Sequence, residues 1–233
     1  MEPLDNPAWY ALGSRQADVA LGDERARRYR VDIDPIAGVP DEPGPEAWAA
    51  LAALHGSDGP LILLRRHTEL PSTFEVRFSG RVHQMVARTP IARPAGATFL
   101  ELTASDDEEM LALARETNPG PFAIHTRELG EYIGLRDEGR RLVAMAGQRM
   151  RLPGYTEVSA VCTLPDQRGR GLAAALTAEI SARIFEAGDV PFLHVLETNE
   201  GARRIYERMG FETRAVLDAL FIRPVREGSD GGA

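Results

Sequence analysis

The most regular apolar pattern in the chain lies in residues 171–187, where apolar side chains recur every four positions from Leu172 to Ile184. Such a stripe predicts an amphipathic helix with one face packed on a sheet. The apolar runs on either side of it, residues 155–164 and 191–198, predict strands. The three elements together predict a strand, a helix and a second strand in succession.

The same reasoning extends this order over the rest of the second half of the chain. Further strands are predicted at residues 97–103, 131–137, 141–150 and 214–223, and further helices at 105–117, 122–129 and 199–210. Ser105 with Glu108 predicts a capping box at the start of the first of these helices. Glu138-Gly139 predicts the turn between the two middle strands.

The first half of the chain predicts shorter elements. Helices are expected at residues 7–21 and 45–55, and strands at 29–33, 61–66, 74–78 and 82–87. Asn6-Pro7 supplies an N-cap and a proline at the first helical position. Ser79-Gly80 predicts a hairpin turn between the last two strands.

A segment rich in proline and glycine, residues 88–97, separates these two halves. We therefore predict a smaller α/β domain over residues 1–95, an α/β domain over residues 96–224 and a disordered tail at 225–233. A length of 233 residues fits one elaborated domain or two modest ones.

Composition and charge exclude several classes of protein. All 27 basic residues are arginine, so enzymes that need a lysine for a Schiff base, for pyridoxal phosphate or for a phosphate-binding P-loop are excluded. The net charge of -8 argues against a nucleic-acid partner and favours attraction of a cationic amine.

The cysteine count and the apolar runs predict the compartment. Cys162 is the only cysteine, so the chain forms no internal disulfide, and no Cys/His cluster suggests a metal. The N-terminus lacks a signal peptide pattern, and no apolar run is long enough to span a membrane. We expect a soluble, cytoplasmic protein with no metal and no membrane partner.

Candidate chemistry lies in the loop after the strand at residues 155–164. Glycines 169 and 171 let a ligand approach the backbone, and the first turn of the following helix presents free N-H groups to an anion. The loop also fits a loose GxGxxA pattern, so a dinucleotide-binding oxidoreductase is an alternative. Four residues separate its glycines from the strand, however, and Asp189 precedes the next strand instead of ending it. A connecting loop without a ligand is a further alternative.

Arg168-Gly169-Arg170-Gly171-Leu172-Ala173 resembles the [Q/R]-x-x-G-x-[G/A] loop of the GNAT superfamily, the acyl-coenzyme A dependent N-acyltransferases. Downstream, Asn199, Ala202, Tyr206 and the Gly210-Phe211 pair resemble a second segment of that family. The resemblance covers residues 96–224 and implies a GNAT fold: a twisted mixed sheet with helices on both faces. It says nothing about residues 1–95, which we expect to form a smaller α/β domain or a degenerate GNAT-like domain that covers the acceptor side.

The resemblance implies that acetyl-CoA is the co-substrate and assigns the residues that bind it. These are Val161, Cys162 and Thr163 along the pantetheine arm, Arg168, Gly169, Arg170, Gly171, Leu172 and Ala173 around the pyrophosphate, and Asn199, Ala202 and Tyr206. Cys162 itself has no neighbour in sequence that would activate its thiol, so a small buried residue is expected.

Two residues are expected to be catalytic. Tyr206 stands where the family places a tyrosine that protonates the leaving thiolate, and its alternative role is core packing. Glu157 resembles the general base of the glycine N-acyltransferase branch, which is followed at the same spacing by Thr163-Leu164-Pro165. His194 and Glu197 are the reserve bases.

The predicted function is transfer of an acyl group, chiefly acetyl, from coenzyme A to a primary amine on a small molecule or a protein N-terminus. A non-catalytic acyl-CoA sensor is the main alternative. Acceptor identity, acyl length and oligomeric state are left open by the sequence.

Overall fold

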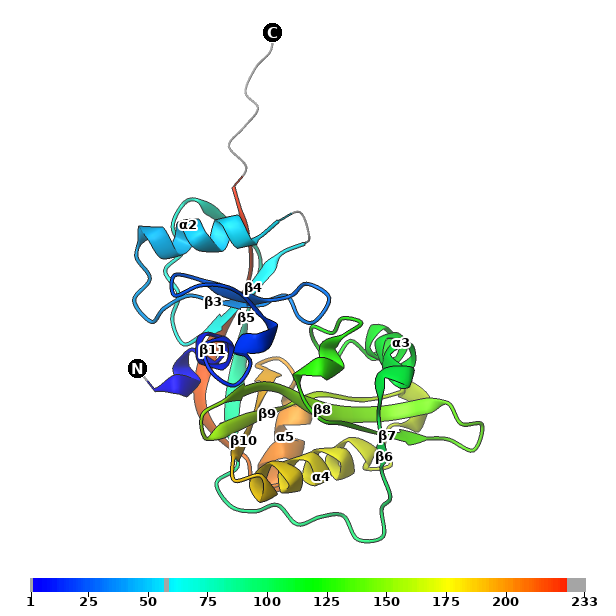
Figure 1. Ribbon diagram of the computed structural model, residues 1–233. Helices are drawn as coiled ribbons and strands as arrows, with labels where there is room; N and C mark the ends of the chain where they lie inside the picture. The colour runs from blue at the N-terminus through cyan, green and yellow to red at the C-terminus, as the bar shows by residue number, and fades with distance from the viewer. Residues whose placement is uncertain (1, 57–58, 226–233) are drawn as a thin grey trace.

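The computed structural model describes residues 2–56 and 59–225, which form one mixed sheet of 11 strands with helices on both faces (Figure 1). The strands are β1 Ala20–Gly22, β2 Arg27–Tyr29, β3 Ile36–Gly38, β4 Leu61–Arg65, β5 Phe74–Val86, β6 Leu100–Glu101, β7 Tyr132–Arg136, β8 Leu142–Leu152, β9 Tyr155–Thr163, β10 Val190–Leu196 and β11 Glu212–Pro224. Their order in the sheet is β1-β2-β3-β4-β11-β5-β10-β9-β8-β7-β6.

The described residues also form α1 Pro7–Leu12, which precedes the first strand, and four α-helices that lie between strands: α2 Pro45–Leu54, α3 Asp107–Thr117, α4 Leu172–Glu186 and α5 Glu200–Arg208. Short 3-10 helices add η1 Pro3–Asp5, η2 Ala17–Val19, η3 Ala104–Asp106, η4 Thr126–Leu129 and η5 Pro165–Gln167. Within the described ranges, no helix is long and apolar enough to cross a membrane.

The two faces of the sheet carry different layers. Helices α4 and α5 pack on one face, where Leu193 and Val195 of β10 meet the stripe of α4. Helix α3 and the N-terminal segment pack on the other face, where Phe192 of β10 meets Leu4 and Leu12 (Figure 1). The alternation of side chains along β10 separates these two cores.

The predicted elements around the glycine loop are confirmed. The four-residue stripe forms α4 because Leu176, Ile180 and Ile184 are each at most 1% exposed against the sheet. Strands β9, β10 and β11 and helix α5 lie within two residues of their predicted bounds, and β7 and β8 form the predicted antiparallel pair.

The predicted hairpin at Ser79-Gly80 is wrong, because residues 74–86 form one continuous strand, β5. Ser79 pairs with Leu220 and Gly80 with Ala219 of β11, and Gly80 does not have the positive φ that a tight hairpin turn requires. Long-range pairing with β11 therefore overrides the local turn signal.

Several other predicted helices and strands are longer than the observed elements or displaced from them. The helix expected over 7–21 ends at Leu12, the strand expected over 97–103 shortens to β6, and residues 122–125 precede η4 instead of joining it. Strand β2 covers only the start of the strand expected over 29–33. The capping box lies two residues earlier than predicted, with the Thr103 N-H donating to the Asp106 carboxylate over 2.8 Å.

The N-terminal and C-terminal segments share this one sheet. Strand β5, from the first segment, lies between β10 and β11 of the second and pairs with both. Residues 87–99 connect β5 to β6 without a helix or strand. The division at residue 95 stays a prediction. Of the tail expected over residues 225–233, Val225 donates its N-H to the Thr73 carbonyl over 2.8 Å, and residues 226–233 lie outside the described residues.

Candidate active site

Strands β9 and β10 form a fork at the centre of the sheet. They pair in parallel only at three positions, which end at Glu157 opposite Phe192. Beyond these residues β10 continues to pair with β5 on its other edge, up to Leu196. The edge of β9 from Val158 onward is therefore open toward the fork.

A bulge in β9 directs backbone groups into this opening. Ala160 has a φ of +52°, and β9 holds one residue more than β8 between the pairs Met145–Cys162 and Gly147–Ser159. After the bulge, the Leu164 N-H donates to the Val143 carbonyl over 2.9 Å. Because backbone groups alternate in direction along a strand, those of residues 161 and 163 point away from β8, toward the fork.

The glycine loop ends in an uncapped helix N-terminus. Gly169 and Gly171 have φ values of +77° and +76°, and no side chain caps α4. A Cβ added to either glycine would meet nothing within 4 Å, so both positions border open space. Leu172 and Ala173 begin the helix beside this space. Exposed N-H groups at the start of a 15-residue helix are suited to binding an anion, and we refer to this place as the anion site.

The two arginines of the loop have different surroundings. Arg168 donates from Nε to the Thr163 carbonyl over 3.3 Å, which joins the loop to the open edge of β9. Arg170 is exposed, donates to Gln167 and lines a cavity of about 510 Å³ together with Arg136 and Leu172. Both cations therefore lie beside the anion site.

Cys162 is buried in the core between the sheet and α3. Burial raises the pKa of its thiol to about 11, so the thiol is protonated at neutral pH. Its side chain therefore has a packing role and is not a nucleophile, as the sequence predicts.

Glu157 lies at the apex of the fork in a buried ion pair. Its side chain is 1% exposed, and Arg149 donates to it twice, from Nε over 2.9 Å and from Nη2 over 2.8 Å. The Met150 N-H adds a third, longer contact of 3.3 Å. Burial alone would raise the pKa of Glu157, but the Arg149 charge and hydrogen bonds lower it to about 2.

His194 contacts Glu157 across the fork. Its Nδ1 lies 2.7 Å from Glu157 Oε1, and its Nε2 lies 3.1 Å from Gln84 Nε2. The Gln84 amide is oriented by Leu4, whose carbonyl accepts from Nε2, and by Arg214, which donates to Oε1. Gln84 is therefore the donor to His194, which leaves Nε2 unprotonated and Nδ1-H donating to Glu157.

Asp34 completes this buried network on the side of the N-terminal segment. It is fully buried, its Oδ1 accepts from the Ile36 N-H over 2.9 Å, and its Oδ2 lies 3.9 Å from Arg149 Nη1. Burial raises the pKa of Asp34 to about 6. No sequence motif pointed to Asp34, Gln84 or Arg149. Gln84 reaches His194 through the pairing of β5 with β10, Arg149 reaches Glu157 across the β8–β9 hairpin, and Asp34 lies in the loop before β3.

Tyr206 lies on α5, on the opposite face of the sheet. Its ring packs edge to face on Phe211 at 6.0 Å, and its hydroxyl has no hydrogen-bond partner among residues 2–56 and 59–225. Burial raises its pKa to about 12, so it is a protonated donor at neutral pH. Asn199 caps α5 by accepting from the Ala202 N-H over 3.2 Å, and this cap fixes the start of the helix that holds Tyr206.

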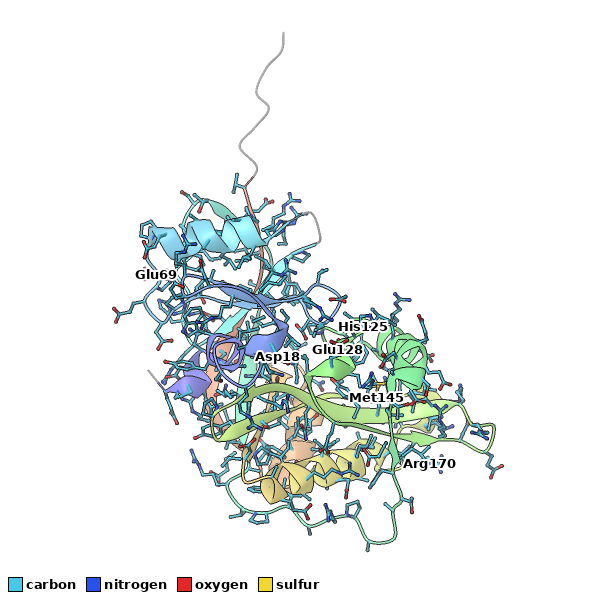
Figure 2. The ribbon with its side chains drawn as sticks, viewed as in Figure 1. Asp18, Glu69, His125, Glu128, Met145 and Arg170 are labelled. Atoms are coloured by element: carbon cyan, nitrogen blue, oxygen red, sulfur yellow. The ribbon has the colours of Figure 1, made fainter. Side chains whose placement is uncertain are left out.

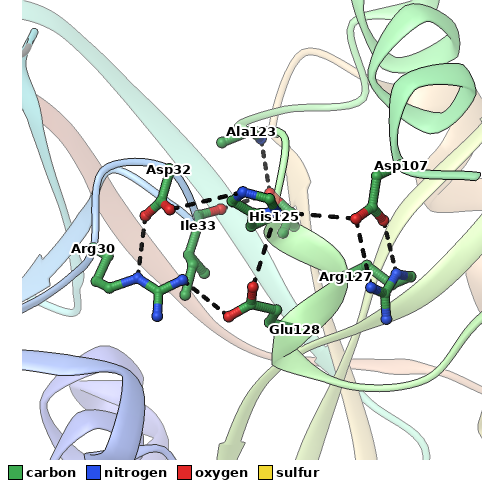
Figure 3. A network of polar contacts seen from close by, with 9 residues as sticks. Arg30, Asp32, Ile33, Asp107, Ala123, His125, Arg127 and Glu128 are labelled. Atoms are coloured by element: carbon green, nitrogen blue, oxygen red, sulfur yellow. Dashed lines mark hydrogen bonds and ion pairs between the residues drawn. The ribbon is translucent and has the colours of Figure 1, made fainter. Parts of the chain in front are cut away.

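A second polar cluster lies on the face of the sheet that α3 covers (Figure 3). The His125 ring lies within 4.0 Å of three carboxylates, those of Asp32, Asp107 and Glu128. The backbone N-H of His125 donates to the Asp32 backbone carbonyl over 2.8 Å. Arg127 donates to Asp107 over 2.7 Å. The cluster joins the N-terminal segment to α3, and its carboxylates are paired with Arg30 and Arg127.

The remaining predicted candidates lie outside the fork. Glu197 is exposed and faces Arg81 at 3.8 Å. Among the residues that the structure describes, no group of three His, Cys, Asp or Glu side chains is arranged to hold a metal ion.

Comparison with known proteins identifies the fold and its family. The family model of FR47-like proteins matches residues 132–219, which include the fork, the glycine loop and α5. A search of curated proteins found no match.

Solved structures match over nearly the whole chain. A protein described as an acetyltransferase from the GNAT family of Novosphingobium aromaticivorans is 36% identical, with 97% of this chain and 100% of that chain covered and a TM-score of 0.89. A GCN5-related N-acetyltransferase from Kribbella flavida is 21% identical over 92% of this chain and 95% of that chain, with a TM-score of 0.60. A GCN5-related N-acetyltransferase-like protein from Streptococcus suis is 15% identical over 88% and 82%, with a TM-score of 0.55. The last two matches bear on the fold alone.

Proposed function

The chain belongs to the GNAT family of acyl-CoA-dependent acetyltransferases, and we propose that it moves an acetyl group from acetyl-CoA to a primary amine. The acceptor is a small molecule or a protein N-terminus. One observation carries this proposal: the fork between β9 and β10 joins an open strand edge, an anion site and a buried carboxylate–imidazole pair.

The residues present fit acetyl-CoA. The start of α4, with Gly169 and Gly171, would hold the pyrophosphate, and Arg168 and Arg170 add positive charge beside it. The backbone groups of residues 161 and 163 would pair with the amides of the pantetheine arm as a neighbouring strand does. When bound, acetyl-CoA supplies the activated acyl group.

We assign proton uptake from the amine to the Glu157–His194 pair. A carboxyl with a pKa of about 2 is a weak base, so we assign the proton to Nε2 of His194, which must first release the hydrogen bond that it accepts from Gln84. Glu157 then holds the imidazole in its tautomer and stabilises its protonated form, as in a carboxylate–histidine pair of a hydrolase. This division of roles refines the prediction of Glu157 as base, which rested on likeness to the glycine N-acyltransferase branch.

We assign Tyr206 to protonation of the leaving thiolate, since its hydroxyl is a free donor.

We further propose that residues 1–95 cover the acceptor side. Three of their polar side chains support this: Asp34 and Gln84 belong to the buried network, and Asp32 belongs to the cluster around His125. A cytoplasmic location is part of the same proposal and rests on the single free thiol, Cys162.

The function is tested by incubating the protein with acetyl-CoA and a panel of primary amines while free thiol is measured. We expect turnover with at least one amine, rising with pH as the amine deprotonates. Binding of acetyl-CoA without turnover across a broad panel would instead support a sensor.

His194→Gln tests the proton acceptor. Glutamine keeps a donor and an acceptor near Glu157 and Gln84 but cannot take up a proton, so turnover at neutral pH should fall about 10²-fold and recover as pH rises. Acetyl-CoA affinity should be unchanged. Glu197→Gln, which alters the exposed reserve base, is the matched control and should keep parental turnover. Equal pH profiles for His194→Gln and the parent would exclude His194.

A further inference from the structure

A second cavity of about 440 Å³ lies at the other end of the sheet. It is formed by the start of α2, the end of β4 and the loop that follows β4. Glu69 marks its rim and Arg170 marks the glycine loop, and Figure 2 shows them at opposite ends of the molecule. Three strands separate β4 from β9 in the sheet, so this cavity is no part of the acyl-transfer site.

Arg65 is a buried cation in the wall of this cavity. It is 5% exposed, and within the described residues it donates only to backbone carbonyls, from Nη1 to Pro40 over 3.1 Å and from Nη2 to Asp41 over 2.7 Å. Its Nε has no hydrogen-bond partner in the described part of the chain. A buried guanidinium whose partners are neutral is stabilised by an anion, because charge-assisted bonds offset its desolvation.

The neighbouring carboxylate of Asp41 already has its own donors. Its Oδ1 accepts from Asn6 Nδ2 over 3.0 Å, and its Oδ2 accepts from the Tyr10 hydroxyl over 2.8 Å. Both oxygens are therefore held toward the N-terminal segment. Asp41 affects Arg65 through its charge but forms no side-chain hydrogen bond with it.

The rest of the wall adds one donor and an apolar surface. The Thr68 hydroxyl is buried without a partner among the described residues. Trp48 is 7% exposed and its ring is fixed edge to face on Phe74 at 5.8 Å. Leu70 completes an apolar side. The lining is about half polar and half apolar, and the volume lies within the range of small-molecule sites.

We propose that this cavity binds a small monocarboxylic acid with an aromatic or aliphatic body. The carboxylate would be held by Arg65 and Thr68, and the body would lie against Trp48 and Leu70. A carboxylate fits better than inorganic phosphate because the apolar walls give phosphate no contact.

Tryptophan fluorescence offers a direct test. The chain has two tryptophans, and Trp9, under the guanidinium of Arg27, does not line the cavity. Trp9→Phe therefore leaves Trp48 as the only indole reporter. Titration of this variant with phenylacetate should give a saturable fluorescence change, and the neutral phenylacetamide should bind at least about tenfold more weakly, as expected for loss of a charge-assisted bond.

Two substitutions, each made in the Trp9→Phe variant, test which side chains hold the carboxylate of phenylacetate. Thr68→Val removes an unpartnered hydroxyl and should preserve folding, while phenylacetate affinity falls several-fold. Arg65→Gln should weaken phenylacetate about tenfold or more and bring its affinity down to that of the amide. Acetyl-CoA affinity should be the same in all variants.

The proposal is overturned if phenylacetamide binds as tightly as phenylacetate, or if no saturable change occurs with either. Displacement of phenylacetate by inorganic phosphate at equal concentration would likewise contradict a carboxylate site. Should Arg65→Gln fail to fold, the comparison of acid with amide in Trp9→Phe still decides the question.

Discussion

Replacing Arg149 by methionine is expected to lower the free energy of unfolding by about 3 to 5 kcal/mol, the usual effect of removing one partner of a buried ion pair. The substitution leaves two buried carboxylates, Glu157 at 1% exposure and Asp34 at 0%, without their cation. Urea unfolding at neutral pH measures the loss. Arg204→Met removes an exposed pair with Glu200 and should change stability by no more than about 0.5 kcal/mol.

The loss of unfolding free energy in Arg149→Met should depend on pH. In the parent, Arg149 lowers the folded-state pKa of Glu157 to about 2, so this stabilisation is present above the unfolded pKa and is lost as pH falls through the folded value. In the variant, burial without a cation raises the folded-state pKa of both carboxyls, so stability is lost as pH rises. The difference between the two proteins should therefore be largest above neutral pH and shrink toward pH 4. A small loss of unfolding free energy that does not change with pH would show that Arg149 does not stabilise the charges of Glu157 and Asp34.

Tyr206→Phe is expected to reduce turnover about 10²-fold, the lower end of what a positioned acid contributes. The ring keeps its packing on Phe211, and the hydroxyl has no partner among the described residues to lose, so the melting temperature should stay close to that of the parent. Steady-state thiol release with acetyl-CoA and an active amine measures the effect.

An acyl donor with a more acidic thiol provides the control for Tyr206. A better leaving group needs less protonation, so this donor should partly restore the rate of Tyr206→Phe while changing the parent less. Parental turnover with acetyl-CoA would mean that Tyr206 only packs against the sheet. A rate loss that the acidic thiol does not relieve would also exclude the proton-donor role.

Local sequence signals predicted the elements around the anion site. The stripe of α4 and the apolar runs of β9 and β10 are regular, and each is buried as its pattern indicates. Gly169 and Gly171 marked the start of α4 because a positive φ is readily adopted only by glycine. In these places the local preference and the tertiary fold agree.

Contacts that depend on strand order could not be predicted. Ser79-Gly80 has turn residues, yet β11 continues the pairing through both of them. Glu157 and His194 were weighed as alternative bases, whereas the register of β9 and β10 joins them into one pair. Arg149, which lowers the pKa of Glu157, comes from the adjacent strand β8 and carries no motif.

Acetyl-CoA affinity in two matched glycine variants tests most directly whether the cofactor binds at the start of α4. Gly171 and Gly188 flank the two ends of this helix, have φ values of +76° and +85°, and border space in which an added Cβ meets nothing within 4 Å. Leucine at either position therefore imposes a similar backbone strain, but only at position 171 does its side chain stand in front of the exposed N-H groups. Calorimetric titration should show acetyl-CoA binding at least about tenfold weaker in Gly171→Leu and unchanged in Gly188→Leu. Equal affinities in the two variants would contradict binding at this loop.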